Sequence, residues 1–342
     1  MPTINSVVTE ATIADSTSAD PAIEAEHLVK RYGETVAVAD VSFAVTRGEI
    51  FGYLGRNGSG KTTTVRVLTT LTRPSSGTAR VADVDITDTR WVRERIGVTM
   101  QDAALDDAMT GAEHLRFVAG LSGATRSAAR ARAAELLELV GLEAVASARI
   151  GTYSGGMKRR LDIASALVGQ PRVLFLDEPT TGLDPQSRRA VWDEIRSLRA
   201  TGVTVFLTTQ YIEEADQLAD RIAIIDAGAI IAQDAPRALK AAHGRTTITF
   251  DHDGDLRRVR DALDGTDGIE VGLDGGGRTI VSLDTATSRD DGTLRILDRM
   301  RAAGVAPAHL AVTETSLEDV FVRLTGTAIN GPGGSTSSDG ER

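Results

Sequence analysis

The feature that most constrains this chain is a glycine-rich loop, Gly55 to Thr62, which reads Gly-Arg-Asn-Gly-Ser-Gly-Lys-Thr. It fits the pattern G-x-x-x-x-G-K-S/T, and it follows an apolar stretch typical of a strand and precedes a helical stretch. The glycines let backbone N–H groups turn inward around phosphate oxygens, and the helix start adds partial positive charge. A glycine-rich turn without a ligand is the alternative for the loop alone. The loop therefore predicts a strand, a nucleotide-phosphate site and a helix in succession.

Two side chains of this loop have a specific chemical task. Lys61 is expected to reach the outer phosphates, where it also assists catalysis, and the Thr62 hydroxyl is expected to ligate magnesium. The predicted cofactors are therefore ATP and Mg2+. The predicted nucleotide-binding residues of this segment are Gly55, Asn57, Gly58, Ser59, Gly60, Lys61, Thr62 and Thr63.

A second polar feature ends an apolar stretch further along the chain, where Val173 to Leu176 is followed directly by Asp177 and Glu178. Ligands of open α/β sheets bind at the carboxyl ends of the strands, which is where these two carboxylates would lie. Asp177 suits a contact to magnesium, and Glu178 suits a general base for water. Acids after a strand can also mark a plain turn into solvent. Together with the lysine loop they predict a site for MgATP.

Composition narrows the class of protein. With 342 residues, of which 41% are hydrophobic, the chain can bury a sizeable core, and two domains are the first expectation. The net charge of -10 counts against a dedicated nucleic-acid binder. There are no cysteines, which excludes disulfides, thiolate metal sites and Cys nucleophiles. No stretch approaches the roughly 20 apolar residues that a membrane-spanning helix needs, so we expect that this chain does not itself cross a bilayer.

Strand and helix patterns alternate from Ile23 to about Asp234, which predicts an α/β domain with a largely parallel sheet. Its helical insert is expected at about 105–165, where an Ala- and Arg-rich stretch has helical spacing. After Gly244 the order β-α-β-β-α-β predicts a small split βαβ domain, with Gly275 to Gly277 as a turn. The expected organisation is a disordered tail at 1–22, an ATPase domain at 23–243, a small C-terminal domain at 244–326 and a disordered tail at 327–342. The clearest buried strands are Glu49 to Leu54, Arg172 to Leu176, Val203 to Thr208 and Arg221 to Ile225.

A second anion-binding feature, after the glycine-rich loop, is Tyr153-Ser154-Gly155-Gly156-Met157, which precedes a helix. Ser154 can cap that helix, and the two glycines leave backbone N–H groups open to an anion. A capped helix without any ligand is the alternative.

A chain that holds all three features resembles the ATP-binding cassette (ABC) family over roughly 23–234. The resemblance implies a P-loop NTPase fold with an ABC-type nucleotide-binding domain and a helical insert, followed here by a small α+β, ferredoxin-like domain. It also implies that Tyr32 stacks on adenine, that Gln101 links magnesium to the partner interface, and that Ser154, Gly155 and Gly156 belong to the signature that binds nucleotide. Asp184 lies at the position of the family's D-loop, and it is carried over as a nucleotide-site residue.

The family pairs two ATPase domains head to tail, so that the signature of one domain caps the nucleotide of the other. This chain holds one set of motifs, and a homodimer is therefore expected. The family usually has a histidine where this chain has Gln210. Glutamine can still donate to a phosphate oxygen and accept from water, but it cannot carry a proton charge. Gln210 is kept as a catalytic candidate, with hydrolysis expected to survive.

With Gln210 and the terminal segment Ser316 to Phe321, the chain is similar to daunorubicin-resistance-type ATP-binding subunits. That resemblance implies an integral membrane permease as partner, export of a drug, antibiotic or lipid, and a location on the cytoplasmic face of the plasma membrane. The resemblance also ties this terminal segment, and with it the C-terminal domain, to regulation and to stable partnership with the permease. The alternative is that its apolar side chains serve plain packing: Leu317, Val320, Phe321 and Leu324. Two other functions stay open: a soluble ABC-type ATP switch that acts on ribosomes or DNA, and a P-loop kinase. No nucleic-acid partner is expected from the charge.

Overall fold

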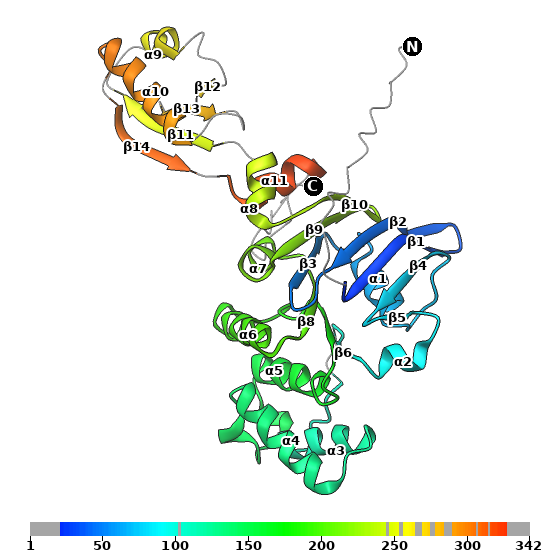
Figure 1. The fold of residues 1–342 in the computed structure, drawn as a ribbon. Helices are drawn as coiled ribbons and strands as arrows, with labels where there is room; N and C mark the ends of the chain where they lie inside the picture. Colours follow the sequence, from blue (N-terminus) through cyan, green and yellow to red (C-terminus); the bar gives the residue numbers. More distant parts are fainter. Residues whose placement is uncertain are drawn as a thin grey trace, which may run out of the picture.

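The ATPase part is built on a six-stranded sheet in the order β10-β9-β3-β8-β7-β6, in which only the edge strand β10 is antiparallel to its neighbour (Figure 1). The computed structural model describes residues 21–101, 104–243, 246–252, 256–263, 269–273, 278–283, 289–305, 307–313 and 315–326. The strands are β3 (Ile50–Gly55), β6 (Ile96–Thr99), β7 (Val173–Asp177), β8 (Thr204–Thr209), β9 (Arg221–Asp226) and β10 (Ala229–Asp234). Strands β3, β7 and β8 are buried along their whole length, as expected for a parallel sheet covered on both faces. The predicted α/β class is confirmed.

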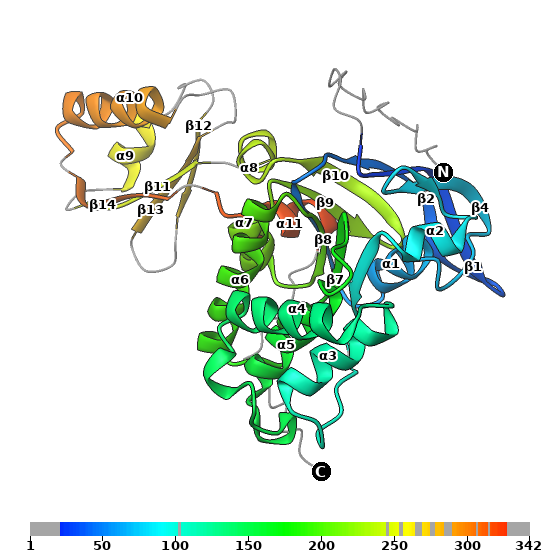
Figure 2. The ribbon, with the colours of Figure 1, turned by 60° about the horizontal axis from the view of Figure 1, so that its bottom comes forward.

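One face of this sheet is covered by a smaller antiparallel sheet, in the order β2-β1-β4-β5. Helix α1 lies between the two sheets, because its Val65, Val67 and Leu68 belong to the same core cluster as residues of both (Figure 2). Stacked rings join the layers: Phe43 of β2 lies 5.6 Å from Phe51 of β3. The elements are β1 (Ile23–Tyr32), β2 (Thr35–Val45), α1 (Lys61–Leu68), β4 (Ser76–Val81), β5 (Val84–Asp85) and α2 (Thr89–Arg93).

The other face is covered by helices, including the predicted helical insert. Leu136 of α4 and Leu161 of α5 share one buried cluster with Leu174 of β7 and Ile195 of α6. The elements are α3 (Gly111–Leu121), α4 (Arg126–Leu139), α5 (Gly155–Ala166), α6 (Pro185–Leu198) and α7 (Ile212–Leu218), with short 3-10 turns at Glu143–Val145, Ile150–Thr152 and Arg199–Thr201. In the part of the chain that the structure describes, no helix combines the length and apolar character that crossing a membrane requires.

The small domain follows α8 (Pro236–His243) and has the strand order β12-β13-β11-β14, with every pair antiparallel. This is the split βαβ arrangement that the order of its elements predicts, and its own core includes Phe250, Val259, Val281 and Ile296. The elements are β11 (Thr246–His252), α9 (Leu256–Leu263), β12 (Ile269–Leu273), β13 (Arg278–Leu283), α10 (Arg289–Ala302) and β14 (Pro307–Thr313). The tails expected at 1–22 and 327–342 lie almost wholly outside the described residues, as does the turn expected at Gly275 to Gly277.

The last helix, α11 (Leu317–Thr325), differs from the expectation that it closes the small domain. Its Leu317, Val320 and Phe321 are buried in a cluster with Leu54 of β3 and Ile224 of β9. The helix returns to the ATPase domain because its apolar face fits the surface beside α7 and α8 (Figure 1). The small domain is thus flanked by two helices, α8 and α11, that both pack on the ATPase domain.

Candidate functional site

The glycine-rich loop connects β3 to α1, which begins at Lys61. Gly58 and Gly60 have φ values of +81° and +107°, a region that residues with a Cβ atom rarely adopt. At Gly60 a Cβ atom would also lie 2.4 Å from the carbonyl oxygen of Ala37, so only glycine fits. The backbone can therefore adopt the curled conformation that a phosphate-binding loop requires. The glycines of the sequence pattern stand at the positions that need this conformation.

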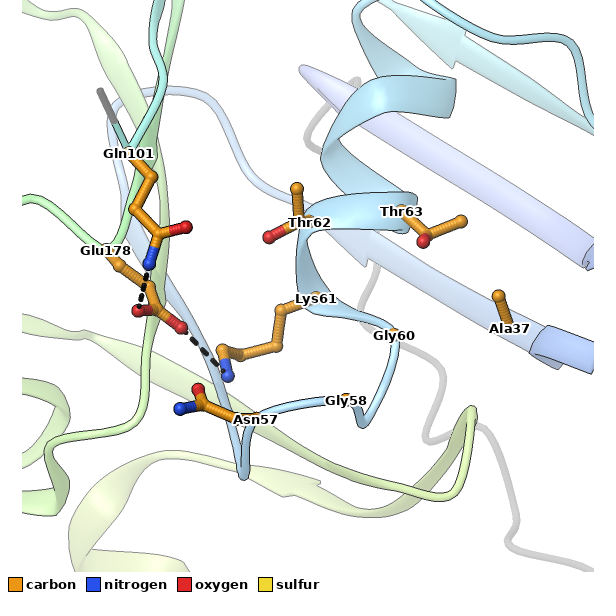
Figure 3. A pocket seen from close by; sticks show the side chains of 9 residues that line it. All are labelled: Ala37, Asn57, Gly58, Gly60, Lys61, Thr62, Thr63, Gln101 and Glu178. Carbon is orange, nitrogen blue, oxygen red and sulfur yellow. Dashed lines mark hydrogen bonds and ion pairs between the residues drawn. The ribbon is translucent and has the colours of Figure 1, made fainter. Parts of the chain in front are cut away.

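A cavity of about 290 Å³ opens over this loop (Figure 3). Its lining combines the loop with two side chains from distant parts of the chain, Gln101 after β6 and Glu178 after β7. The lining residues are Ala37, Asn57, Gly58, Gly60, Lys61, Thr62, Thr63, Gln101 and Glu178. Of the predicted site residues, six of the loop and two outside it therefore meet in one place.

Lys61 is held inside the cavity by three oxygen atoms. Its Nζ donates to the carbonyl oxygens of Gly55 at 2.8 Å and Arg56 at 3.0 Å, and it lies 3.1 Å from Oε1 of Glu178. Burial lowers the pKa of the Lys61 ammonium, and the charge of Glu178 opposes that shift. The ammonium is therefore preorganised, but its ionic partner in the free protein is a carboxylate rather than a phosphate.

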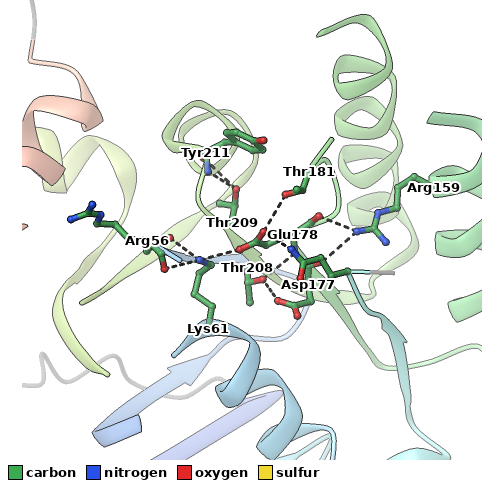
Figure 4. A network of polar contacts seen from close by, with 11 residues as sticks. Arg56, Lys61, Arg159, Asp177, Glu178, Thr181, Thr208, Thr209 and Tyr211 are labelled. Atoms are coloured by element: carbon green, nitrogen blue, oxygen red, sulfur yellow. Dashed lines mark hydrogen bonds and ion pairs between the residues drawn. The ribbon is translucent and has the colours of Figure 1, made fainter. Parts of the chain in front are cut away.

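Glu178 is fixed from several sides (Figure 4). Its Oε2 accepts from the amide of Gln101 at 3.3 Å and from the hydroxyl of Thr181 at 3.2 Å. Its backbone N–H donates to the carbonyl oxygen of Thr208 at 3.1 Å. Its φ of +50° is unusual for a residue with a side chain, and it turns the chain sharply at the end of β7. Backbone strain of this kind is typical of functional positions.

Asp177 is fully buried next to this turn. Its Oδ1 accepts from the Thr208 hydroxyl at 2.5 Å, whereas its Oδ2 has no hydrogen-bond partner among the described residues. A buried carboxylate oxygen without a partner is costly, so it fits a cation as its missing contact. The described residues hold no group of three or more His, Cys, Asp or Glu that could bind a metal. Asp177 and the Thr62 hydroxyl could hold magnesium together with nucleotide phosphates, because magnesium commonly uses one or two carboxylates plus phosphate oxygens.

Other predicted site residues do not line the cavity. Tyr32, at the end of β1, is 48% exposed, and its ring lies 4.8 Å from Lys30 Nζ. Gln210 is half-buried just after β8. Gly55 and Ser59 belong to the loop but lie behind its inner surface, where Ser59 Oγ is buried without a partner among the described residues.

The second anion-binding feature and the D-loop position pack against each other away from the cavity. Ser154 caps α5, since its hydroxyl accepts from the Met157 N–H at 3.2 Å. Asp184 caps α6 in the same way, accepting from the Ser187 N–H at 2.9 Å. A Cβ atom on Gly156 would lie 2.8 Å from Cβ of Ser187, so this glycine is required by packing. Both helix starts are thus capped by side chains of the same chain. Ser154, Gly155 and Asp184 are nevertheless exposed at the surface.

Three residues that the sequence reasoning missed support the site: Thr181, Thr208 and Arg159. The two threonine hydroxyls donate to the carboxylates described above. Arg159 of α5 sends its buried guanidinium to the turn that carries Glu178 (Figure 4). A threonine near the end of a buried strand is a weak indication of such a role, and Arg159 is one of 34 arginines, so nothing in its local sequence distinguishes it.

Comparison with known proteins identifies relatives of this chain. The family model described as ABC transporter matches residues 38–181. The daunorubicin resistance ATP-binding protein DrrA3 of Streptomyces coeruleorubidus is 43% identical over 311 residues, which is 90% of this chain and 97% of that protein. The Nod factor export ATP-binding protein I of Burkholderia pseudomallei is 41% identical over 306 residues, 89% of this chain and 97% of that protein. The solved structure of cbiO1 from Clostridium perfringens, part of the ABC transporter complex cbiONQ, superposes with a TM-score of 0.62 at 28% identity, over 65% of this chain and 92% of that one.

Proposed function

This chain belongs to the ABC transporter family as an ATP-binding subunit with an ATPase domain, and from that premise we propose that it powers export through a separate membrane permease. The observation that carries the proposal is the meeting of Lys61, Glu178 and Gln101 in one cavity over the phosphate loop. In this proposal the loop amides and Lys61 hold the phosphates of MgATP, and Asp177 and Thr62 hold magnesium. Glu178 takes a proton from the attacking water, and the Gln210 amide assists from the end of β8.

The working form is proposed to be a head-to-tail homodimer with ATP at its interface. Ser154 and Gly155 are exposed at the start of α5, and they do not line the cavity of their own chain. The first turn of a helix favours a negatively charged ligand, so these N–H groups can bind the γ-phosphate of a nucleotide held by a second copy. Asp184 is exposed in the same region and would face that copy too.

The permease is proposed to dock on the helical subdomain. On α3, Phe117 is 55% exposed and Leu121 is 74% exposed, one helical turn apart. Such a pair is a suitable contact for an apolar segment of a membrane protein. Gln101 precedes this subdomain in the chain and touches Glu178, so it would pass movement at the docking face to the ATP site. The chain would then act at the cytoplasmic face of the plasma membrane.

The substrate class rests on the relatives. One is a daunorubicin resistance protein and another a Nod factor export protein, so a drug, antibiotic or lipid-like molecule is the proposed cargo. Tyr32 is proposed to stack on the adenine of ATP, since it ends β1 of the same domain and its ring is half exposed. The small domain is proposed to be regulatory.

The ATP site is tested with Lys61→Ala in an assay of retained radiolabelled ATP. Loss of the buried ammonium should weaken ATP binding about 100-fold, because a charge-assisted contact to a phosphate in a desolvated site is worth about 3 kcal/mol. Lys240→Ala is the matched control, since Lys240 pairs with Asp216 and does not line the cavity. Equal retention of ATP by Lys61→Ala and the unaltered protein would contradict the proposal.

The transport role is tested by co-expression with a candidate permease. Co-purification with an integral membrane protein, and stimulation of ATP hydrolysis when both are in lipid vesicles, are the expected results. Sedimentation with ribosomes or salt-sensitive capture on DNA, without a membrane partner, would instead favour the soluble switch.

A further inference from the structure

A buried arginine, Arg159, connects helix α5 to the turn that carries Glu178. In the proposed dimer, the start of α5 would contact the nucleotide of the second copy, whereas Glu178 would act on the nucleotide of its own chain. Arg159 lies in the second turn of α5, the helix that begins with Gly155, and only 7% of its surface is exposed. Its guanidinium reaches the backbone of Asp177 and Glu178, in the turn after β7 (Figure 4). A buried guanidinium needs several acceptors, so its contacts show what it holds in place.

All three nitrogens of this guanidinium are occupied. Nε donates to the carbonyl oxygen of Pro179 at 2.6 Å, and Nη2 donates to that of Glu178 at 2.9 Å. Nη1 donates to the carbonyl oxygen of Met100 at 2.8 Å and pairs with the Asp162 carboxylate at 3.1 Å. Arg159 therefore holds the backbone at both polar residues of the cavity. It contacts Met100, which precedes Gln101, and it contacts Glu178 itself and the following Pro179.

This arrangement has a mechanical consequence for Glu178. Its φ of +50° is disfavoured for a residue with a Cβ atom, so the turn needs external contacts to persist. Arg159 supplies two of them, at the carbonyls of Glu178 and Pro179. A planar guanidinium with donors in a fixed fork can bridge carbonyls on separate segments, which the single ammonium of lysine cannot reproduce.

We infer that Arg159 is a positioning residue for Glu178: it holds the backbone of that residue, and of Met100 before Gln101, in the geometry required for hydrolysis. The inference rests on the proposed role of Glu178 as the general base. Because Arg159 is carried by α5, it also ties the orientation of Glu178 to the helix whose start would bind the nucleotide of the second copy.

The test uses the full chain with Arg159→Met and Arg159→Lys. Both variants should bind ATP within about threefold of the unaltered protein, while kcat should fall about 100-fold, the usual effect of misplacing a reacting group by about 1 Å. Arg159→Lys keeps a positive charge opposite Asp162, so it remains informative if the methionine variant fails to fold. Arg160→Met is the matched control, because the neighbouring Arg160 donates to the Val140 carbonyl oxygen and not to the turn. Its kcat should stay within about twofold of normal.

A purely structural role is separated by combining Arg159→Met with Glu178→Gln. If Arg159 acts through Glu178, adding Arg159→Met should not further slow the residual hydrolysis of the Glu178→Gln variant. An equal loss of rate in both backgrounds, or a normal kcat for Arg159→Lys, would overturn the inference. Normal turnover by Glu178→Gln alone would refute the proposed role of Glu178 itself, and the inference with it.

Discussion

Replacing Glu178 by glutamine should tighten the binding of MgATP about tenfold and leave only residual hydrolysis. In the free protein the carboxylate lies 3.1 Å from Lys61 Nζ, and both side chains are buried. A γ-phosphate must take over Lys61 from this carboxylate and must also tolerate its negative charge. Glutamine keeps the shape and can still accept from Lys61, but it removes the charge, so the free state loses stabilisation and the bound state loses repulsion.

The size of the effect follows from the geometry. Two unit charges at this separation attract by about 5 kcal/mol at an effective dielectric constant of 20. Most of that attraction is offset by the cost of removing both charges from water. A net change of about 1.4 kcal/mol, which is tenfold in Kd, is therefore the expected gain.

Binding is measured by calorimetry with a non-hydrolysable ATP analogue and, separately, with ADP. The gain should be large for the analogue and small for ADP, because ADP lacks the phosphate that competes with Glu178. Glu213→Gln is the matched control, since Glu213 is exposed on α7 and outside the cavity. Unchanged or weaker binding of the analogue, or an equal gain for ADP, would refute the reasoning. The same variant should accumulate an ATP-bound dimer on a sizing column, and an equal monomer content with and without ATP would speak against the dimer.

Three further perturbations test the rest of the molecule. Phe321→Ala, at a fully buried position of α11, should cost about 3–5 kcal/mol in urea unfolding, whereas Leu294→Ala, which is 59% exposed, should change stability by less than about 0.5 kcal/mol. Burial raises the pKa of the Glu194 carboxyl to about 7, above its usual value in water. The folded state therefore holds this proton more tightly, and the stability that it contributes is lost as pH rises from about 4.5 through 7. Glu194→Gln should remove that loss and gain up to about 3 kcal/mol at pH 8 relative to pH 4.5, measured by unfolding at both. Gln210→His should introduce a limb near pH 6.5 in the pH profile of kcat, which the unaltered protein should lack.

The parts of this protein that the sequence determined are those that depend on local pattern. Lys61 could be assigned to a helix start because the glycine and lysine spacing before it is that of a phosphate loop, which leads into a helix. Strand β7 could be assigned because an uninterrupted apolar run suits a strand buried on both faces. The strand predicted at Arg172 to Leu176 is found at Val173–Asp177, a shift of one residue. The small domain was likewise predicted from the order of its elements, which suffices for a split βαβ sandwich.

The contacts between distant segments were decided only by the tertiary structure. The pairing of Lys61 with Glu178 joins residues 117 positions apart, and neither side chain reveals the other in its own neighbourhood of sequence. The same holds for Arg159 and for α11, whose amphipathic pattern predicts a buried face but not whether the small domain or the ATPase domain buries it. The physical reason is that periodicity reports which side of an element avoids water. The surface it meets depends on the shape of the whole folded chain.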